Sequence, residues 1–136
     1  DAFTTLSGVT QKETGTAPFN SPKRLLEAAR LRNAARYLDL TLGDVPVNFL
    51  TDHDTTGGSS GSPLLNARGE LIGLCFDGNY EAISGDYEYD QRVNRTINVD
   101  SRYVLFTLEK VLGATELLDE LSVRGAVSAL DGTEAH

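Results

Sequence analysis

The residues best suited to chemistry in this sequence are the serines of a short glycine-rich stretch, GGSSGSP, at residues 57–63. A serine hydroxyl becomes an effective nucleophile when a tight turn presents it beside a base and backbone N–H groups face the developing oxyanion. Ser60 fits this arrangement, because Gly58 precedes it by two positions and Gly61 follows it. The spacing favours Ser60 as a nucleophile, with the N–H groups of Gly58 and Ser60 as an oxyanion hole. By composition alone, an ordinary glycine-serine turn explains the stretch equally well.

A serine nucleophile also needs a general base, and the sequence contains only two histidines, His53 and His136. His136 ends the chain, and for His53, on the same loop as Ser60, we expect solvent exposure or loop hydrogen bonding. The sequence DHD at residues 52–54 does not favour a metal site, because consecutive residues of an extended stretch point to opposite sides and no second His/Cys cluster exists. We therefore expect no metal and no cofactor.

The length and the charge of the chain restrict the class of protein. Its 136 residues suffice for one domain, which we place at residues 1–121, followed by a flexible tail at residues 122–136. The formal net charge of −8 argues against a nucleic-acid partner, since phosphate binding requires a basic surface. No apolar run approaches the ~20 residues of a membrane-spanning helix. The chain begins at Asp1 without a methionine or a signal-peptide pattern, so we expect a mature product or a piece of a longer protein.

Strand-like segments surround the glycine-rich loop and must hold it in place. Five segments have the composition of strands: residues 3–10, 45–50, 63–65, 70–76 and 95–99. The sequence NARG at residues 66–69 has hairpin-turn chemistry, and a long polar loop occupies residues 77–95. Cys75 lies within an apolar strand, so we expect a small buried hydrophobe without a chemical role, and no intrachain disulfide is possible.

Two longer helices complete the predicted elements. Asn20 or Ser21 can cap a helix over residues 22–38, which carries an apolar stripe and five of the chain's twelve positive charges. We interpret these charges as a solvated helix face. An apolar face predicts a second helix over residues 102–112, and a short helix follows near residues 115–121.

Two longer blocks of sequence resemble one branch of the chymotrypsin-like peptidases. They are TGGSSGSPLLNARGELIGLCFDGNYEAISGD at residues 56–86 and RTINVDSRYVLFTLEKVLGATELLDEL at residues 95–121, within a resemblance that covers residues 4–121. The branch is the bacterial dipeptidyl peptidases 7 and 11. The resemblance implies a serine exopeptidase that removes dipeptides from the free N-terminus of peptides. It also implies a mainly β fold, the second β-barrel of a chymotrypsin-like catalytic domain, present here in part.

The resemblance assigns roles to individual residues. It implies that Ser60 is the nucleophile, that the N–H groups of Gly58 and Ser60 form the oxyanion hole, and that Asp77 helps to bind the free α-amino group of the substrate through a buried carboxylate. At the position of Gly78, the branch that cuts after Asp or Glu has arginine, and the branch that cuts after apolar residues has glycine. Because Gly78 offers no guanidinium, we expect a hydrophobic or otherwise uncharged residue at the cleavage point.

Two positions temper this reading of the loop. Ser59 stands where the family usually has asparagine, at a position that shapes the backbone. Asp54 lies six residues before Ser60, where trypsin-like enzymes place the carboxylate that binds Lys or Arg. Because both branches of the resembling family carry aspartate there, we expect a structural role for Asp54.

The resemblance places the histidine and aspartate of the catalytic triad far upstream, on a first barrel that this chain lacks. We therefore expect the chain to be the C-terminal part of a longer peptidase and to be inactive alone. Its expected partners are a peptide with a free N-terminus, the upstream barrel and a helical domain of the same protein, and a second copy in a homodimer. The family resemblance also implies export to the periplasm or the cell surface.

Two other hypotheses stay open. One is a chymotrypsin-like endopeptidase, or a non-catalytic relative that uses its groove only to bind peptide. The other is a small binding or interaction domain in which residues 57–63 are only a loop. Sequential release of dipeptides, blocked by N-acetylation of the substrate, distinguishes the exopeptidase from the first of these.

Overall fold

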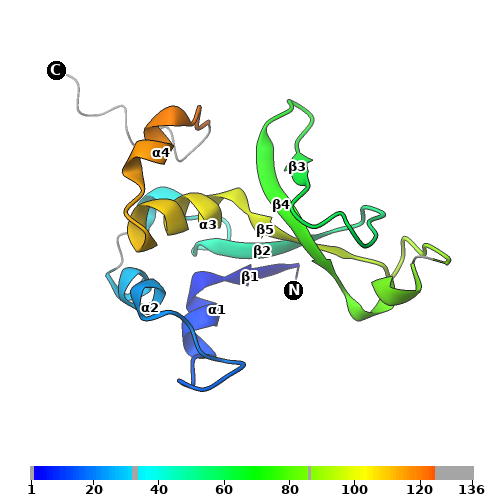
Figure 1. Ribbon diagram of the computed structural model, residues 1–136, viewed down its shortest axis with the longest axis horizontal. Coiled ribbons are helices and arrows are strands. Elements are labelled where there is room, and N and C mark those ends of the chain that lie inside the picture. The colour runs from blue at the N-terminus through cyan, green and yellow to red at the C-terminus, as the bar shows by residue number, and fades with distance from the viewer. Residues whose placement is uncertain (1, 32–33, 86, 125–136) are drawn as a thin grey trace. The chain divides into compact units, whose positions relative to one another are not determined.

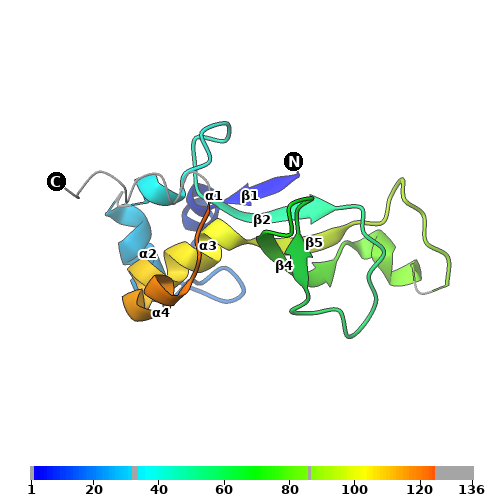
Figure 2. The same cartoon turned by 90° about the horizontal axis from the view of Figure 1, so that it is seen from above.

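The structure, a computed structural model, describes residues 2–31, 34–85 and 87–124. Within them, five strands form one sheet in the order β1-β2-β5-β4-β3. The strands are β1 (Phe3–Thr5), β2 (Pro46–Thr51), β3 (Pro63–Leu65), β4 (Leu71–Gly78) and β5 (Thr96–Asp100). The pairs β2–β5, β5–β4 and β4–β3 are antiparallel, and β5 lies between β2 and β4 in both views (Figure 1 and Figure 2). The predicted mainly β architecture is confirmed, and the antiparallel sheet is consistent with part of a barrel.

The register of β4 against β5 contains an irregularity next to Asp77 and Gly78, two of the predicted site residues. Cys75 pairs with Asn98, and Asp77 pairs with Ile97, so that Phe76 is the extra residue of a β-bulge. A bulge leaves one residue unpaired and changes the direction of the side chains that follow it. The end of β4 therefore presents Phe76, Asp77 and Gly78 differently from a regular strand.

Helices lie between β1 and β2, between β4 and β5, and after β5 in sequence. They are α1 (Leu6–Gln11), α2 (Lys23–Arg30), η1 (Ala35–Tyr37), η2 (Tyr80–Ser84), α3 (Ser101–Phe106), the π-helical turn η3 (Thr107–Val111) and α4 (Thr115–Glu120). The described chain divides into two compact units. One contains Val47–Ser101 with the N-terminal residues up to Thr4, and the other contains Thr5–Pro46 and the chain from Arg102 onward.

The predicted strand over residues 3–10 is wrong in its second half. The strand β1 ends at Thr5, whose hydroxyl accepts a hydrogen bond from the N–H of Gly8 (3.4 Å) and so caps α1. Leu6, the first residue of that helix, is buried. A threonine in this position satisfies an unpaired N–H group of the first helical turn, which outweighs its strand propensity.

The predicted helix over residues 22–38 is also wrong in extent, because α2 ends at Arg30 and η1 is a separate turn. Tyr37 is almost fully buried and its ring meets that of Phe106 edge to face, with centroids 5.9 Å apart. Its hydroxyl donates a hydrogen bond to Glu109. These tertiary contacts fix the position of Tyr37.

The other predicted elements are close to those observed. The predicted helix over residues 102–112 corresponds to α3 followed by η3, and the short C-terminal helix corresponds to α4. The domain limits at residues 1–121 stay a prediction. Most of the predicted flexible tail, including His136, lies outside the described residues.

Candidate active site

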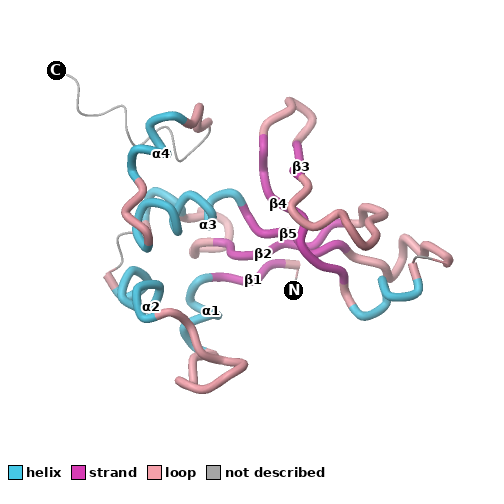
Figure 3. The backbone as a smooth tube through the Cα atoms, viewed as in Figure 1, coloured by secondary structure: helices cyan, strands magenta, loops and turns pink. Residues whose placement is uncertain are grey.

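The loop between β2 and β3 forms two consecutive turns around Ser60 and contains no helix or strand (Figure 3). The N–H of Ser59 donates to the carbonyl of Thr56 (3.0 Å), and the N–H of Ser62 donates to the carbonyl of Ser59 (3.0 Å). Gly58 has a φ of +100° and Gly61 a φ of +86°, a region that residues with a side chain rarely adopt. The glycines are thus required by the backbone path.

Hydrogen bonds to β4 fix the second half of this loop. The N–H of Gly61 donates to the carbonyl of Cys75 (2.7 Å), and the N–H of Cys75 donates to the carbonyl of Ser62 (2.9 Å). These bonds extend the pairing of β3 with β4 back toward Ser60. The Ser60 hydroxyl is exposed and donates to the carbonyl of Phe76 (3.3 Å). Cys75 itself is buried, as predicted.

The predicted oxyanion donors are Gly58 and Ser60. Within the described part of the chain, the loop's internal hydrogen bonds do not use the N–H of either residue. Backbone donors left without an internal partner in an exposed turn are available to an incoming oxygen. The left-handed backbone at Gly58 and the turn at Ser60 are compatible with such a role.

A hollow of about 220 Å³ lies beside the Ser60 hydroxyl. It is lined by residues 55–57 and 60 of the loop, residues 75–79 at the end of β4, and residues 82 and 83 of η2. The structure therefore brings Ser60, Asp77 and Gly78 together at one pocket, whereas Gly58 lies on the loop outside the lining. An exposed hydroxyl, a carboxylate and an apolar wall around one small pocket suit the binding of a short peptide end.

Sequence reasoning did not identify Phe76, Ala82 and Ile83 as parts of this pocket. Phe76 reaches it because of the β-bulge, and the other two belong to the 3₁₀ turn η2 that follows β4. The sequence offers only the spacing, since Ala82 follows Gly78 by four residues. This spacing indicates a contact between the two residues only when the segment between them is known to form a turn.

Asp77 differs from the expected buried carboxylate. Its side chain is exposed, and its carboxylate accepts a hydrogen bond from the N–H of Gly78 (2.8 Å). An exposed carboxylate at the pocket is free to approach a cationic group of a ligand, but water screens the interaction more than in a buried site. The expectation of burial for Asp77 is wrong in this structure.

His53 and Asp54 are both exposed, and neither lines the pocket. The carbonyl of His53 accepts a hydrogen bond from the buried Thr96 hydroxyl (2.9 Å), which also shares a hydrogen bond with Thr55 (2.7 Å). Thr96 thus anchors the start of the loop to the central strand. Among the described residues, no group of three or more His, Cys, Asp or Glu side chains is placed to hold a metal ion.

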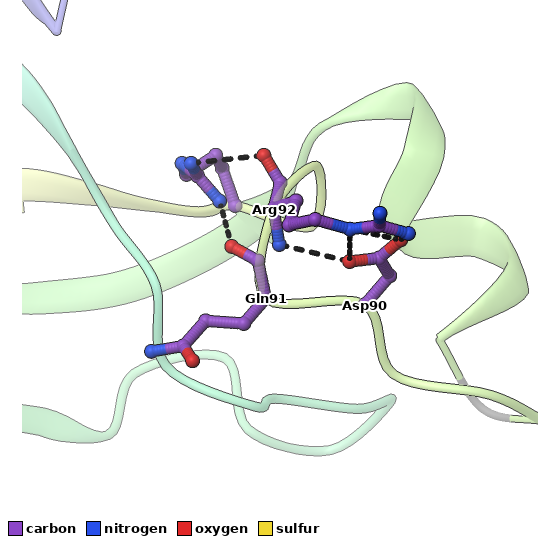
Figure 4. Close-up of polar contacts among 4 residues, drawn as sticks. Asp90, Gln91 and Arg92 are labelled. Atoms are coloured by element: carbon purple, nitrogen blue, oxygen red, sulfur yellow. Dashed lines mark hydrogen bonds and ion pairs between the residues drawn. The ribbon is translucent and has the colours of Figure 1, made fainter.

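Two arginines that follow the pocket residues in sequence, Arg92 and Arg95, are engaged elsewhere. The guanidinium of Arg92 forms an ion pair with Asp90, which lowers the pKa of that carboxyl to about 2 (Figure 4). The guanidinium of Arg95 donates to the carbonyls of Gln91 (2.8 Å), Asn94 (2.6 Å) and Arg92 (3.2 Å). No Lys, Arg or His is found among the described residues that line the pocket.

The sequence of residues 1–123 matches the model of one protein family, described as peptidase S46. The chain belongs to the peptidase S46 family. The chain is 48% identical over 122 residues to the dipeptidyl-peptidase 7 of Phocaeicola vulgatus, a match that covers 89% of this chain and 17% of that protein. It is 38% identical over 142 residues to the Asp/Glu-specific dipeptidyl-peptidase of Shewanella putrefaciens, covering 89% of this chain and 19% of that protein. The chain therefore spans less than a fifth of the length of these relatives.

Solved structures agree with this assignment to peptidase S46. The crystal structure of Porphyromonas endodontalis DPP11 in complex with the dipeptide Arg-Asp matches with a TM-score of 0.85 and 42% identity, over 90% of this chain and 18% of that one. A second structure of DPP11 from the same organism holds the dipeptide Arg-Glu and matches with a TM-score of 0.82 and 43% identity, over 88% of this chain and 17% of that one. The recognised family is thereby confirmed.

The comparisons do not support the expected preference for an uncharged residue at the cleavage point. Relatives named dipeptidyl-peptidase 7 and relatives named Asp/Glu-specific dipeptidyl-peptidase both match the chain. The dipeptides in the two solved structures end in an acidic residue.

No helix in the described part of the chain has the length and apolar character that crossing a membrane requires.

Proposed function

We propose that this chain is the C-terminal catalytic portion of a longer serine dipeptidyl peptidase, and that Ser60 is its nucleophile. The observation that carries the proposal is the convergence of the exposed Ser60 hydroxyl, the Asp77 carboxylate and Gly78 on one pocket of about 220 Å³. The dipeptidyl-peptidase names of its peptidase S46 relatives support the reaction class. The small part of those relatives that the chain spans supports the existence of further catalytic segments.

In this proposal the oxygen of Ser60 attacks the carbonyl carbon of the second residue of the substrate. The proton passes to a base on an upstream segment, and the backbone N–H groups of Gly58 and Ser60 stabilise the oxygen that becomes negative. Collapse of the tetrahedral intermediate breaks the peptide bond and releases the shortened peptide, whose amine takes the proton. Water then hydrolyses the acyl-enzyme and releases the dipeptide.

In this proposal, Asp77 holds the N-terminus of the substrate so that cleavage follows the second residue. Its exposed carboxylate lies at the pocket that contains Ser60, so it can pair with the free α-amino group of the substrate. A charge-assisted hydrogen bond of this kind fails when the amine is acetylated. Export to the periplasm or cell surface remains a proposal that rests on the family alone, and a homodimer remains one that rests on the apolar surface an isolated half-barrel exposes.

For the residue at the cleavage point, the pocket itself supports an uncharged side chain. Phe76, Ala82 and Ile83 contribute apolar surface, whereas Asp77 contributes a negative charge. An acidic side chain placed there meets no cationic partner among the lining residues, and Gly78 supplies none. The dipeptides in the solved DPP11 structures end in an acidic residue instead, so the two kinds of second residue are compared directly.

The test is the release of dipeptides by the full-length source protein from peptides with Leu or Glu as the second residue. We expect release of intact dipeptides from free N-termini, loss of release after N-acetylation, and a higher kcat/KM for the Leu peptide. Internal cleavage that acetylation does not affect would contradict the exopeptidase proposal. A higher kcat/KM for the Glu peptide would contradict only the inferred preference.

A further inference from the structure

At the pocket, Gly78 lies so close to Ala82 that this contact restricts which residue position 78 can hold. A Cβ atom added to Gly78 would lie 2.9 Å from the Cβ of Ala82. Carbon atoms in contact are separated by about 3.5–4.0 Å, so this position has no room for a side chain. Gly78 is not among the glycines with a positive φ. Space, rather than backbone conformation, therefore requires glycine here.

The strand side of this contact is fixed. Gly78 pairs with Thr96 in the β4–β5 ladder. The next residue, Asn79, donates its N–H to the carbonyl of Arg95 (2.9 Å) and accepts the N–H of Arg95 on its side-chain oxygen (2.9 Å). Its side-chain amide also donates to the carbonyl of Val93 (2.8 Å). Any shift of Gly78 breaks part of this set of hydrogen bonds.

The turn η2, which carries Ala82, is fixed as well. The N–H of Ala82 donates to the carbonyl of Asn79 (3.0 Å), and the N–H of Gly85 donates to the carbonyl of Ala82 (2.9 Å). A Cβ atom on Gly85 would lie 2.5 Å from the side-chain amide of Asn94, a residue only 4% exposed. The turn is therefore seated tightly against the chain that enters β5.

We propose that Ala82 is a second specificity-determining residue of this pocket, because it decides which residue position 78 can hold. The inference rests on the proposed peptidase function. With alanine at position 82, the pocket wall accepts only glycine at position 78, and the pocket has no cationic side chain in its lining. A cationic side chain at position 78, which recognition of an acidic substrate residue needs, requires a smaller residue at position 82.

The test compares four forms of the full-length source protein: wild type, Gly78→Arg, Ala82→Gly and the double variant. Substrates are peptides with a free N-terminus and Leu or Glu as the second residue. We expect Gly78→Arg alone to lower kcat/KM at least tenfold for both peptides. The double variant is expected to raise kcat/KM for the Glu peptide at least tenfold above Gly78→Arg. Equal activity of Gly78→Arg and the double variant on the Glu peptide would overturn the proposal.

A matched control separates this contact from a general enlargement of the pocket. Ile83 is the neighbour of Ala82 in η2, lines the same pocket and is 70% exposed. The variant Gly78→Arg combined with Ile83→Ala enlarges the pocket without removing the Cβ of Ala82. We expect no recovery on the Glu peptide in this combination. Recovery equal to that given by Ala82→Gly would contradict a specific role for Ala82.

A readout without activity keeps the inference separate from the proposed function. We expect Gly78→Ala to lower the midpoint of thermal unfolding, and Ala82→Gly to recover at least half of that loss when the two are combined. Independent effects of the two substitutions would overturn the inference. Absence of dipeptide release from every form, wild type included, with this coupling intact would instead contradict the proposed function.

Discussion

Ser60 owes its position to its neighbours in the loop. Gly58 and Gly61, both with positive φ, turn the backbone on either side of it, and the N–H of Gly61 ties the loop to β4. The spacing of the glycines indicated a tight turn around Ser60, which the positive φ values of Gly58 and Gly61 agree with, but composition alone left an ordinary glycine-serine turn equally open. The exposure of Asp77 was not predictable, because it depends on the β-bulge at Phe76, which no residue type in β4 signals.

The first prediction concerns Gly61. The substitution Gly61→Ala places a side chain at a φ of +86°, which costs about 1–2 kcal/mol of stability. We expect the free energy of unfolding, measured in urea, to fall by that amount and kcat/KM of the full-length protein to fall with it. Because Gly57 lines the pocket, Gly57→Ala is the control for the stability measurement only; Gly57 has open space and is not among the glycines with positive φ. Equal losses in both variants would show that the left-handed backbone is unimportant.

At the scale of elements, β5 organises the site. Its buried residues are polar, namely Thr96, Asn98 and Asp100, whereas Ile97 and Val99 are only half-buried. The side-chain amide of Asn98 donates to the Thr51 hydroxyl (3.0 Å) on β2. A central strand thus uses its buried face to fix neighbouring strands and loops by hydrogen bonds.

The second prediction tests the anchor at Thr96. Thr96→Val keeps the shape of the side chain but removes hydrogen bonds to the His53 carbonyl and the Thr55 hydroxyl. Because two hydrogen bonds worth about 0.5–1.5 kcal/mol each are lost, we expect a loss of about 1–3 kcal/mol in the free energy of unfolding. Thr55→Val removes one of the two bonds and should cost less. A neutral Thr96→Val in urea unfolding would exclude the proposed anchor.

The elements show where local sequence patterns were sufficient. The strands around the loop and the NARG turn at residues 66–69 could be predicted, because alternation and turn residues act over a few positions. The extent of the helix at residues 22–38 could not, since the position of Tyr37 depends on Phe106 and Glu109, far along the chain. The prediction of a strand over residues 3–10 was wrong beyond Thr5, because Thr5 caps a helix.

At the scale of the whole molecule, the unit made of Thr5–Pro46 and the chain from Arg102 onward is held by contacts between these two distant sequence segments. Arg102 donates to the Asp39 carboxylate (2.6 Å), and Tyr37 packs against Phe106. Both segments, Thr5–Pro46 and the chain from Arg102 onward, are therefore needed for this unit. Truncation of the second segment removes Phe106, the fully buried partner of Tyr37, and truncation of the first removes most of the unit's described buried hydrophobic residues.

The third prediction is a pH dependence of stability. The hydrogen bond from Arg102, with help from the N–H groups of Leu42 and Thr41, holds the pKa of Asp39 below its ordinary value of 3.8. Since the folded state binds this proton less readily than the unfolded state, the contribution is complete above pH 4 and is lost as the pH falls through the folded pKa. The pair is partly exposed, so it contributes about 0.5–1 kcal/mol.

Urea unfolding of the chain between pH 2 and 7 measures this contribution. We expect both Asp39→Asn and Arg102→Gln to reduce stability at pH 7 and to flatten its decrease below pH 4. If the stability of Asp39→Asn decreases below pH 4 as steeply as that of the wild type, the pH dependence comes from other carboxylates.

In the proposed function, Ser60 is a nucleophile that works with a base outside this chain. The direct measurement is intact mass after reaction with a fluorophosphonate, which forms a covalent bond to the oxygen of an activated serine. The isolated chain, the full-length source protein and its Ser60→Ala variant are compared. We predict one adduct on the full-length protein alone. An unlabelled full-length protein, or an adduct that persists in Ser60→Ala, would show that Ser60 is not the activated nucleophile.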